Sequence, residues 1–122
     1  ILLITACQRD ETLAAYGAEG TWQLTHVNTK AFSASATITF SEDGQVRGSA
    51  PCNSFSAQQT APYPWFTLGP IIATRRACAD LAAEQDFFSV LTKMTVSEVS
   101  GDVLILSNED GQSLQFMKQP GG

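Results

Sequence analysis

Three cysteines are the residues with the widest chemistry in this 122-residue chain. Cys7 closes the run ILLITAC, Cys52 lies in GSAPCNSF, and Cys78 lies in TRRAC. A thiol can be acylated, oxidised to a disulfide, or used as a metal ligand or a nucleophile. Because the three settings differ so much, the three thiols need not share one role.

The setting of Cys7 is typical of lipid attachment. The apolar run Ile1–Ile4 is far too short to span a bilayer, and the letters ITAC resemble the lipobox of a bacterial lipoprotein signal. We therefore interpret residues 1–6 as the remnant of that signal, Cys7 as the lipid attachment site, and 7–19 as a tether. A buried N-terminal strand is the alternative. By resemblance to enterobacterial lipoproteins, Gln8 in place of Asp favours the periplasmic side of the outer membrane.

Cys52 and Cys78 then remain as an even pair in a compartment where thiols oxidise. One anchor and one candidate disulfide would account for the odd cysteine count. The alternative is two free thiols that only pack, since free Cys is among the most buried residue types. We expect no metal, because two cysteines and the single histidine, His26, leave a tetrahedral zinc set incomplete.

Catalysis and nucleic-acid binding are both disfavoured. A nucleophile would need a neighbouring base and an orienting acid, and His26 is a lone histidine on an expected strand. We therefore expect neither an enzyme nor a cofactor. The net charge is −5, and Arg75-Arg76 is the only adjacent basic pair, so neither nucleic acid nor an anionic membrane surface finds a basic patch. Membrane contact would come only through the lipid on Cys7.

Strand and turn signals dominate from Gly20 onward. The segment TWQLTHVN alternates, which predicts a strand with Trp22, Leu24 and His26 on one face. Residues 35–50 predict a hairpin that turns at Ser41-Glu42-Asp43-Gly44, and a second hairpin turns at Asn108-Glu109-Asp110-Gly111. The inward positions of the two hairpins are Ile38, Phe40, Leu114 and Phe116. Neither Glu-Asp-Gly turn has the spaced oxygen ligands of a calcium loop.

One helix is expected after Cys78. Asp80 is a candidate cap, Glu84 lies near the positive end of the helix dipole, and Lys93 falls in the expected last turn. An apolar stripe at helical spacing comprises Leu81, Phe87, Phe88, Leu91 and Met94. The fold class is thus mainly β (α+β), a curled antiparallel sheet or small barrel with one α-helix packed on it.

The middle of the chain is less regular. Residues 61–64 (APYP) predict a turn, and WFTLGPII predicts a strand broken at Gly69-Pro70. Tyr63 and Trp65 are interpreted as an aromatic plug at one end of the core. The alternative is an exposed aromatic patch for a peptide or a sugar.

The ordered motifs from residue 20 to 118 resemble the META domain family, also called HslJ-like, of bacterial heat-inducible envelope lipoproteins. The matching residues are Gly20, Trp22 and Leu24; Gly48, Cys52 and Asn53; Thr74 and Cys78; Glu84, Phe87 and Leu91; and Leu104 and Leu106. The resemblance implies a META domain over 20–118 with a short tail at 119–122. It also implies structural roles for Trp22, Gly48, Asn53, Thr74 and Glu84. For Cys52 and Cys78 it implies a bridge with Cα atoms about 4.4–6.8 Å apart.

The resemblance implies a link to heat or antibiotic stress. We expect a non-enzymatic, periplasmic META-domain lipoprotein, a monomer that acts as a stress-protective or interaction module on an unknown envelope protein or small ligand. One alternative is a small-molecule or peptide binder that uses the interior or mouth of a barrel. Another is an inhibitor that presents residues 61–64 or Arg75-Arg76 to an envelope hydrolase. An open apolar interior would favour the binder, and a filled core the interaction module.

Overall fold

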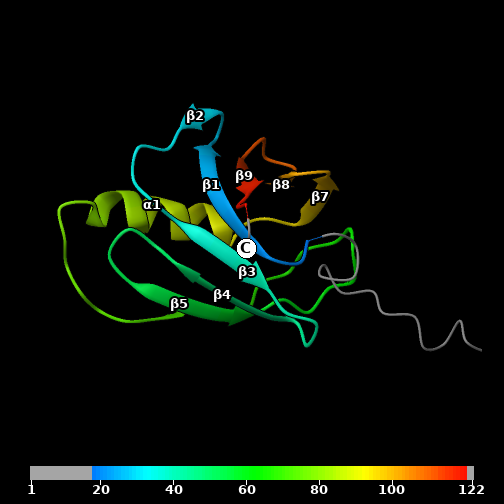
Figure 1. Ribbon diagram of the computed structural model, residues 1–122, viewed down its shortest axis with the longest axis horizontal. Coiled ribbons are helices and arrows are strands. Elements are labelled where there is room, and N and C mark those ends of the chain that lie inside the picture. Colours follow the sequence, from blue (N-terminus) through cyan, green and yellow to red (C-terminus); the bar gives the residue numbers. More distant parts are fainter. Residues whose placement is uncertain (1–17, 121–122) are drawn as a thin grey trace, which may run out of the picture.

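The computed structural model describes residues 18–120, so Cys7, the expected signal remnant and almost all of the expected tether lie outside the described residues. The described part folds into one antiparallel sheet and one helix (Figure 1). The strands are β1 (Thr21–Val27), β2 (Lys30–Ala31), β3 (Thr37–Phe40), β4 (Gln45–Ser49), β5 (Ser54–Gln58), β6 (Ile72–Ala73), β7 (Val96–Ser100), β8 (Val103–Ser107) and β9 (Ser113–Lys118). The helix α1 spans Leu81–Leu91, and it is neither long nor apolar enough to cross a membrane.

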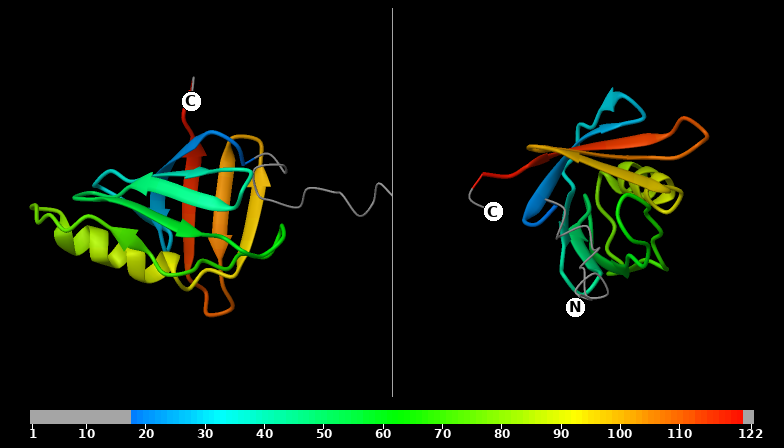
Figure 2. Two further views of the ribbon diagram at one scale, coloured as in Figure 1. Left: turned by 90° about the horizontal axis from the view of Figure 1, so that it is seen from below. Right: turned by 90° about the vertical axis from the view of Figure 1, so that its right-hand side faces the viewer.

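The sheet curls strongly but does not close, so the expected barrel is wrong in that respect. Its strand order is β6-β5-β4-β3-β1-β9-β8-β7, with the short β2 paired to β1. The β3–β6 half and the β7–β9 half meet at an angle across β1, and α1 lies in the concavity between them (Figure 2). The segment that follows β5 makes two isolated β-bridges, Gln59 to Leu68 and Trp65 to Val96, and the second of them connects this segment to the edge strand β7.

The alternation expected for the first strand holds only for its first half. Trp22 and Leu24 are buried, but the register of β1 against β9 shifts between Leu24 and His26. Because one residue is inserted at this bulge, Val27 takes the inward position that the pattern assigned to His26. His26 is half-buried, and its Nδ1 lies 2.9 Å from Thr25 Oγ1.

The expected helix is present, with differences at both ends. Asp80 occupies the N-cap position, but its side chain makes no capping hydrogen bond. The helix ends at Leu91, so Lys93 lies beyond its last turn, which contains no basic residue. Three members of the expected stripe, Phe87, Leu91 and Met94, are buried, while Leu81 and Phe88 are only half-buried. Val90, which the stripe did not include, is also buried because the helix sits deep in the curled sheet.

Side chains from both halves of the sheet and from α1 fill the interior. The largest fully buried apolar side chains are Trp22, Phe66, Phe87, Phe116, Ile38, Leu91, Leu104, Leu106, Leu114 and Val46. Phe55 reaches across from β5 and meets the rings of Phe87 and Phe88 edge-on, at 5.9 and 5.2 Å between centroids. Such aromatic contacts add to the stabilisation from buried area.

Gly48 makes this aromatic packing possible. It is the cross-strand partner of Phe55, and a Cβ added to Gly48 would lie 2.7 Å from the Phe55 ring. The same Cβ would lie 2.1 Å from the carbonyl oxygen of Thr37 on the other side. Only glycine allows such close approach of a neighbouring backbone and ring.

In the expected aromatic plug of Tyr63 and Trp65, Phe66 takes the place of Trp65. Trp65 is 59% exposed, whereas the next residue, Phe66, is 1% exposed and belongs to the core. Tyr63 is half-buried and packs against the core. In this irregular segment the alternation places only one of the two neighbouring rings inward. Of the WFTLGPII segment only Ile72 enters a strand, the two-residue β6, because a Gly-Pro step interrupts pairing.

Candidate functional site

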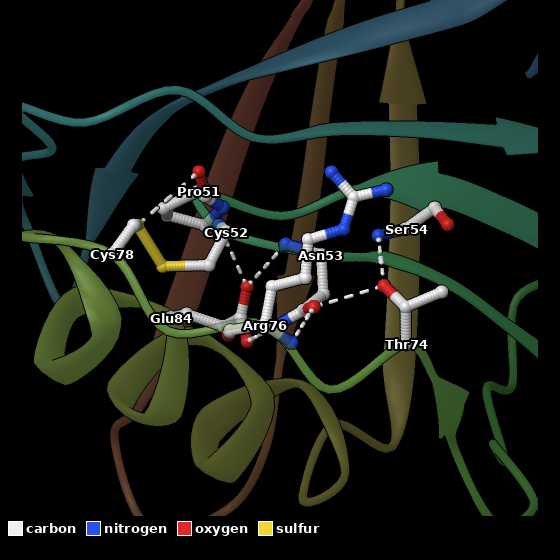
Figure 3. The surroundings of a disulfide bond; sticks show 8 residues. All are labelled: Pro51, Cys52, Asn53, Ser54, Thr74, Arg76, Cys78 and Glu84. Carbon is white, nitrogen blue, oxygen red and sulfur yellow. Dashed lines mark hydrogen bonds between the residues drawn. A yellow bond between two sulfur atoms is a disulfide. The ribbon is translucent and has the colours of Figure 1, made fainter.

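Cys52 and Cys78 form a disulfide that ties the β4–β5 connection to the segment leading into α1 (Figure 3). Their Cα atoms are 5.6 Å apart, within the range expected from the sequence, and 26 positions separate them along the chain. Cys78 is exposed and Cys52 is half-buried, so the bond lies at the surface end of the core.

Glu84 connects the helix to the same connection from beneath the disulfide. Its side chain is buried, at 4% exposure. Oε1 accepts hydrogen bonds from the backbone N–H of Cys52 at 2.8 Å and of Asn53 at 2.9 Å, and Oε2 accepts one from Asn53 Nδ2 at 2.6 Å. A carboxylate with three N–H donors is well compensated for its burial.

Asn53 is the centre of the cluster and is 6% exposed. Its Nδ2 donates to Glu84 and, at 3.0 Å, to the carbonyl oxygen of Arg76. Its Oδ1 accepts from Thr74 Oγ1 at 2.9 Å and from the backbone N–H of Arg76 at 2.6 Å. All of the strong hydrogen-bonding positions of the side-chain amide are therefore used.

Thr74 and Arg76 complete the cluster from the segment that follows β6. Thr74 Oγ1 accepts a hydrogen bond from the backbone N–H of Ser54 at 3.3 Å while it donates to Asn53. Arg76 contributes its backbone only, and its exposed guanidinium points away from the Glu84 carboxylate (Figure 3). We call Cys52, Asn53, Thr74, Cys78 and Glu84 the disulfide cluster.

The disulfide cluster holds backbone rather than presenting reactive groups. It fastens the β4–β5 connection, the segment before α1 and the first turn of α1 to one another through paired donors and acceptors. The two other motif residues lie elsewhere: Gly48 makes room for Phe55, and fully buried Trp22 donates from Nε1 to the carbonyl oxygen of Ala18 at 2.9 Å. Within residues 18–120, no group of three His, Cys, Asp or Glu side chains is placed to hold a metal ion.

The sequence predicts the members of this cluster but not their partners. Glu84 was assigned to the helix dipole, yet its carboxylate binds the backbone of the Cys-Asn pair instead. The role of the Arg76 backbone was missed, because almost every residue has the same main-chain N–H and C=O groups and the residue type does not show which of them bind a side chain. A glutamate one turn into the helix together with a Cys-Asn pair was the available signal.

A family model described as META domain matches residues 12–121, which includes the whole disulfide cluster. The chain belongs to the META domain family. The cluster is therefore the part of this META domain in which five of its motif residues meet. None of the curated proteins compared with the chain matches it.

Solved structures share the fold of this META domain at low sequence identity. A DUF4847 family protein from Bacteroides vulgatus is 14% identical with a TM-score of 0.72, over 90% of this chain and 99% of that one. A protein from Burkholderia xenovorans is 18% identical with a TM-score of 0.67, over 88% and 87%. A third structure, determined by NMR, is 21% identical with a TM-score of 0.62, over 94% and 95%. At these identities the likeness concerns the fold alone.

Proposed function

We propose that this META domain is a non-catalytic, lipid-anchored module of the bacterial envelope that acts by binding a partner through its surface, in a stress-protective role. The observation that carries the proposal is that the motif residues are used to build the fold. The disulfide cluster, Trp22 and Gly48 all stabilise backbone or core. What distinguishes this domain functionally then lies on its surface.

The disulfide supports an oxidising location. It is partly exposed, and such a bond would be reduced by the thiol systems of the cytosol. The periplasm keeps disulfides formed, and lipid attachment at Cys7 would hold the domain there.

The filled interior favours surface binding over binding inside a barrel. The concavity that a barrel-type ligand would occupy contains α1 and the buried rings of Trp22, Phe87 and Phe116. The clefts at Gly44 and Trp65 lie at turns and strand ends instead. An apolar ligand site of ordinary size would need several hundred Å³ that these side chains take up.

The use of polar groups supports a non-catalytic role. Asn53 and Glu84 are buried, and their bonds to backbone leave them fixed. His26 contacts Thr25, its neighbour in the chain. A general base needs to reach a substrate proton, and none of these groups lines the clefts at Gly44, Trp65 or Ile72.

The anchor is tested with the chain expressed behind a complete lipoprotein signal. Cys7→Ser should release the protein from the membrane pellet after a salt wash, because the acyl chains supply the buried CH₂ surface that holds it there. Cys52→Ser with Cys78→Ser is the matched control, since it removes two cysteines and should leave the protein in the pellet. A Cys7→Ser protein that stayed in the pellet would contradict the anchor.

The surface-binding role is tested by capture from an envelope extract. The oxidised, folded chain should retain a partner that the chemically unfolded chain does not. Thiol trapping with a maleimide reagent in intact cells should find Cys52 and Cys78 blocked by their bridge. Reactive thiols at both positions would contradict the oxidising location, whatever the capture shows.

A second candidate, inhibition of an envelope hydrolase, is favoured by one loop. Arg75 and Arg76 are exposed between β6 and Cys78, and the backbone of Arg76 is held at both its N–H and its carbonyl by Asn53. A rigid loop loses little entropy on binding. Arg75→Ala with Arg76→Ala should then abolish capture of an acidic enzyme, whereas Arg47→Ala, another exposed arginine, should not. The other candidate loop, 61–64, is held as firmly, because Gln59 bonds both backbone groups of Ala61 and Pro64 accepts from Ser97, but it presents no charged side chain.

A further inference from the structure

The exposure of Trp65 is the least explained feature of the surface. Its indole is 59% exposed, although burying such a ring would contribute much to stability. The backbone around it is nevertheless firmly held. Trp65 donates its N–H to Pro62 at 2.8 Å and bridges to Val96, and Phe66 donates to Thr95 at 2.8 Å. The ring is thus presented by a fixed support and not by a loose loop.

Trp65 forms one wall of a cleft of about 610 Å³. The other walls come from the α1–β7 link and from the β8–β9 turn, which lie at the same end of the sheet (Figure 2). Trp65, Lys93, Thr95, Val96, Asn108, Glu109 and Asp110 line it, and we call it the Trp65 cleft. Its volume lies within the range of small-molecule sites.

The polar rim of the cleft is also preorganised. Asn108 Nδ2 donates to the carbonyl oxygen of Lys93 at 3.2 Å, and Asn108 Oδ1 accepts from the backbone N–H of Asp110 at 3.0 Å. These bonds fix the turn and the link to each other. The charged ends of Lys93, Glu109 and Asp110 are exposed, and none has a hydrogen bond or ion pair within the described residues. Two acceptor groups and one donor group therefore surround an aromatic face.

We propose that the Trp65 cleft binds a short, uncharged oligosaccharide of pyranose units. The C–H face of a pyranose is weakly positive and stacks on the negative face of an indole. Its hydroxyl groups both donate and accept, so one sugar can satisfy the two carboxylates and the ammonium together. This inference rests on the proposed function in one respect: it names the ligand class for the surface binding that is proposed there.

Other ligand classes fit the cleft less well. An anionic ligand would meet Glu109 and Asp110, and the chain as a whole carries a net charge of −5. A cationic ligand would be repelled by Lys93 but attracted by Glu109 and Asp110, so the titration below includes a cation as the competing class. A peptide strand added to the edge of β7 would collide with Trp65, which already bridges to Val96 there. A neutral sugar can contact the indole of Trp65 and the charged ends of Lys93, Glu109 and Asp110 without charge repulsion.

Tryptophan fluorescence of the oxidised full chain is the direct test. Trp22 is 0% exposed, so quenching by acrylamide reports on Trp65. Titration with triacetylchitotriose, cellotriose or maltotriose should protect Trp65 from the quencher in a saturable way and shift its emission to the blue. Absence of saturable protection by all three sugars at millimolar concentration would overturn the proposal. Protection by choline but by no sugar would also overturn it, and would indicate a cation site.

Variants assign the binding to the cleft. By saturation-transfer NMR on the sugar, Trp65→Ala should weaken binding by at least about tenfold, and Glu109→Gln or Asp110→Asn by about fivefold to tenfold. Ile72→Ala, which removes a 71% exposed side chain at the opposite edge of the sheet, is the control and should change nothing. Unchanged affinity in both Trp65→Ala and Glu109→Gln would refute the site. Because sugar binding is measured on the isolated chain, its failure is distinct from a failure of the anchor or of partner capture.

Discussion

Replacing Asn53 with alanine should lower the free energy of unfolding by about 4 kcal/mol. The change removes four hydrogen bonds, two at Nδ2 and two at Oδ1. The bond to the Glu84 carboxylate contributes about 1.5–3 kcal/mol and each neutral bond about 1 kcal/mol, while exposed Thr74 recovers part of its loss from water. Since domains of this size are stable by about 5–15 kcal/mol, the effect should be large. Urea unfolding of the oxidised chain, followed by circular dichroism, measures it.

Asn108→Ala is a matched control for this experiment. The Asn108 side chain also makes four hydrogen bonds, to Lys93, Gln112 and Asp110. Those partners are neutral groups in a half-exposed turn, so the loss should be only about 1–2 kcal/mol. Equal losses in the two variants would show that neither burial nor the Glu84 carboxylate gives the Asn53 cluster special weight, and the reasoning would fail.

A polarity swap tests the Asn53–Glu84 bond by itself. Asn53→Asp places a second carboxylate against Glu84 and should cost about 3–5 kcal/mol. Adding Glu84→Gln should restore part of the lost free energy of unfolding. The new amide can donate to the new carboxylate, while its oxygen still accepts from the backbone N–H groups at positions 52 and 53. We expect a coupling energy of at least about 1.5 kcal/mol between the two changes. Additive losses would refute a direct bond.

Three further changes test the rest of the fold by urea unfolding. Gly48→Ala should cost about 3 kcal/mol or prevent folding, because its Cβ would meet backbone at 2.1 Å. Gly101→Ala is the control: nothing lies within 4 Å of its Cβ, so it should cost only about 1 kcal/mol for its φ of +59°. Equal costs in the two variants would contradict the packing argument. Phe87→Ala should cost about 3–5 kcal/mol, since the ring is fully buried, and a loss under about 0.5 kcal/mol would make α1 peripheral. Replacing Cys52 and Cys78 with serine should cost about 3.5 kcal/mol, the closure entropy of a loop whose ends are 26 positions apart, and an unchanged midpoint would show that the bridge adds nothing.

The hairpins were predictable because their signals are local. The turns at Gly44 and Gly111 have φ of +85° and +84°, which is the conformation that favours glycine and that an Asp-Gly step predicts. The alternation that flanks them fixed which side chains point inward. Strand β7, by contrast, was missed, because its pattern Val-Ser-Glu-Val-Ser buries Ser97 at 1% exposure. Ser97 is tolerated there because its hydroxyl and its N–H both donate to the carbonyl oxygen of Pro64, a partner 33 positions away.

Sequence alone determined the two hairpins, the helix and the candidate cysteine pair, since residue type and spacing carry those signals, and the family resemblance indicated the other residues of the disulfide cluster. Tertiary structure decided how they are used. It turned His26 out of the inward position through a bulge, left the sheet open and exposed Trp65 while burying Phe66. It also turned the Glu84 carboxylate towards the Cys52 and Asn53 N–H groups. Each of these outcomes depends on contacts between segments far apart in the chain, whose main-chain donors and packing surfaces exist only once the sheet has curled around α1.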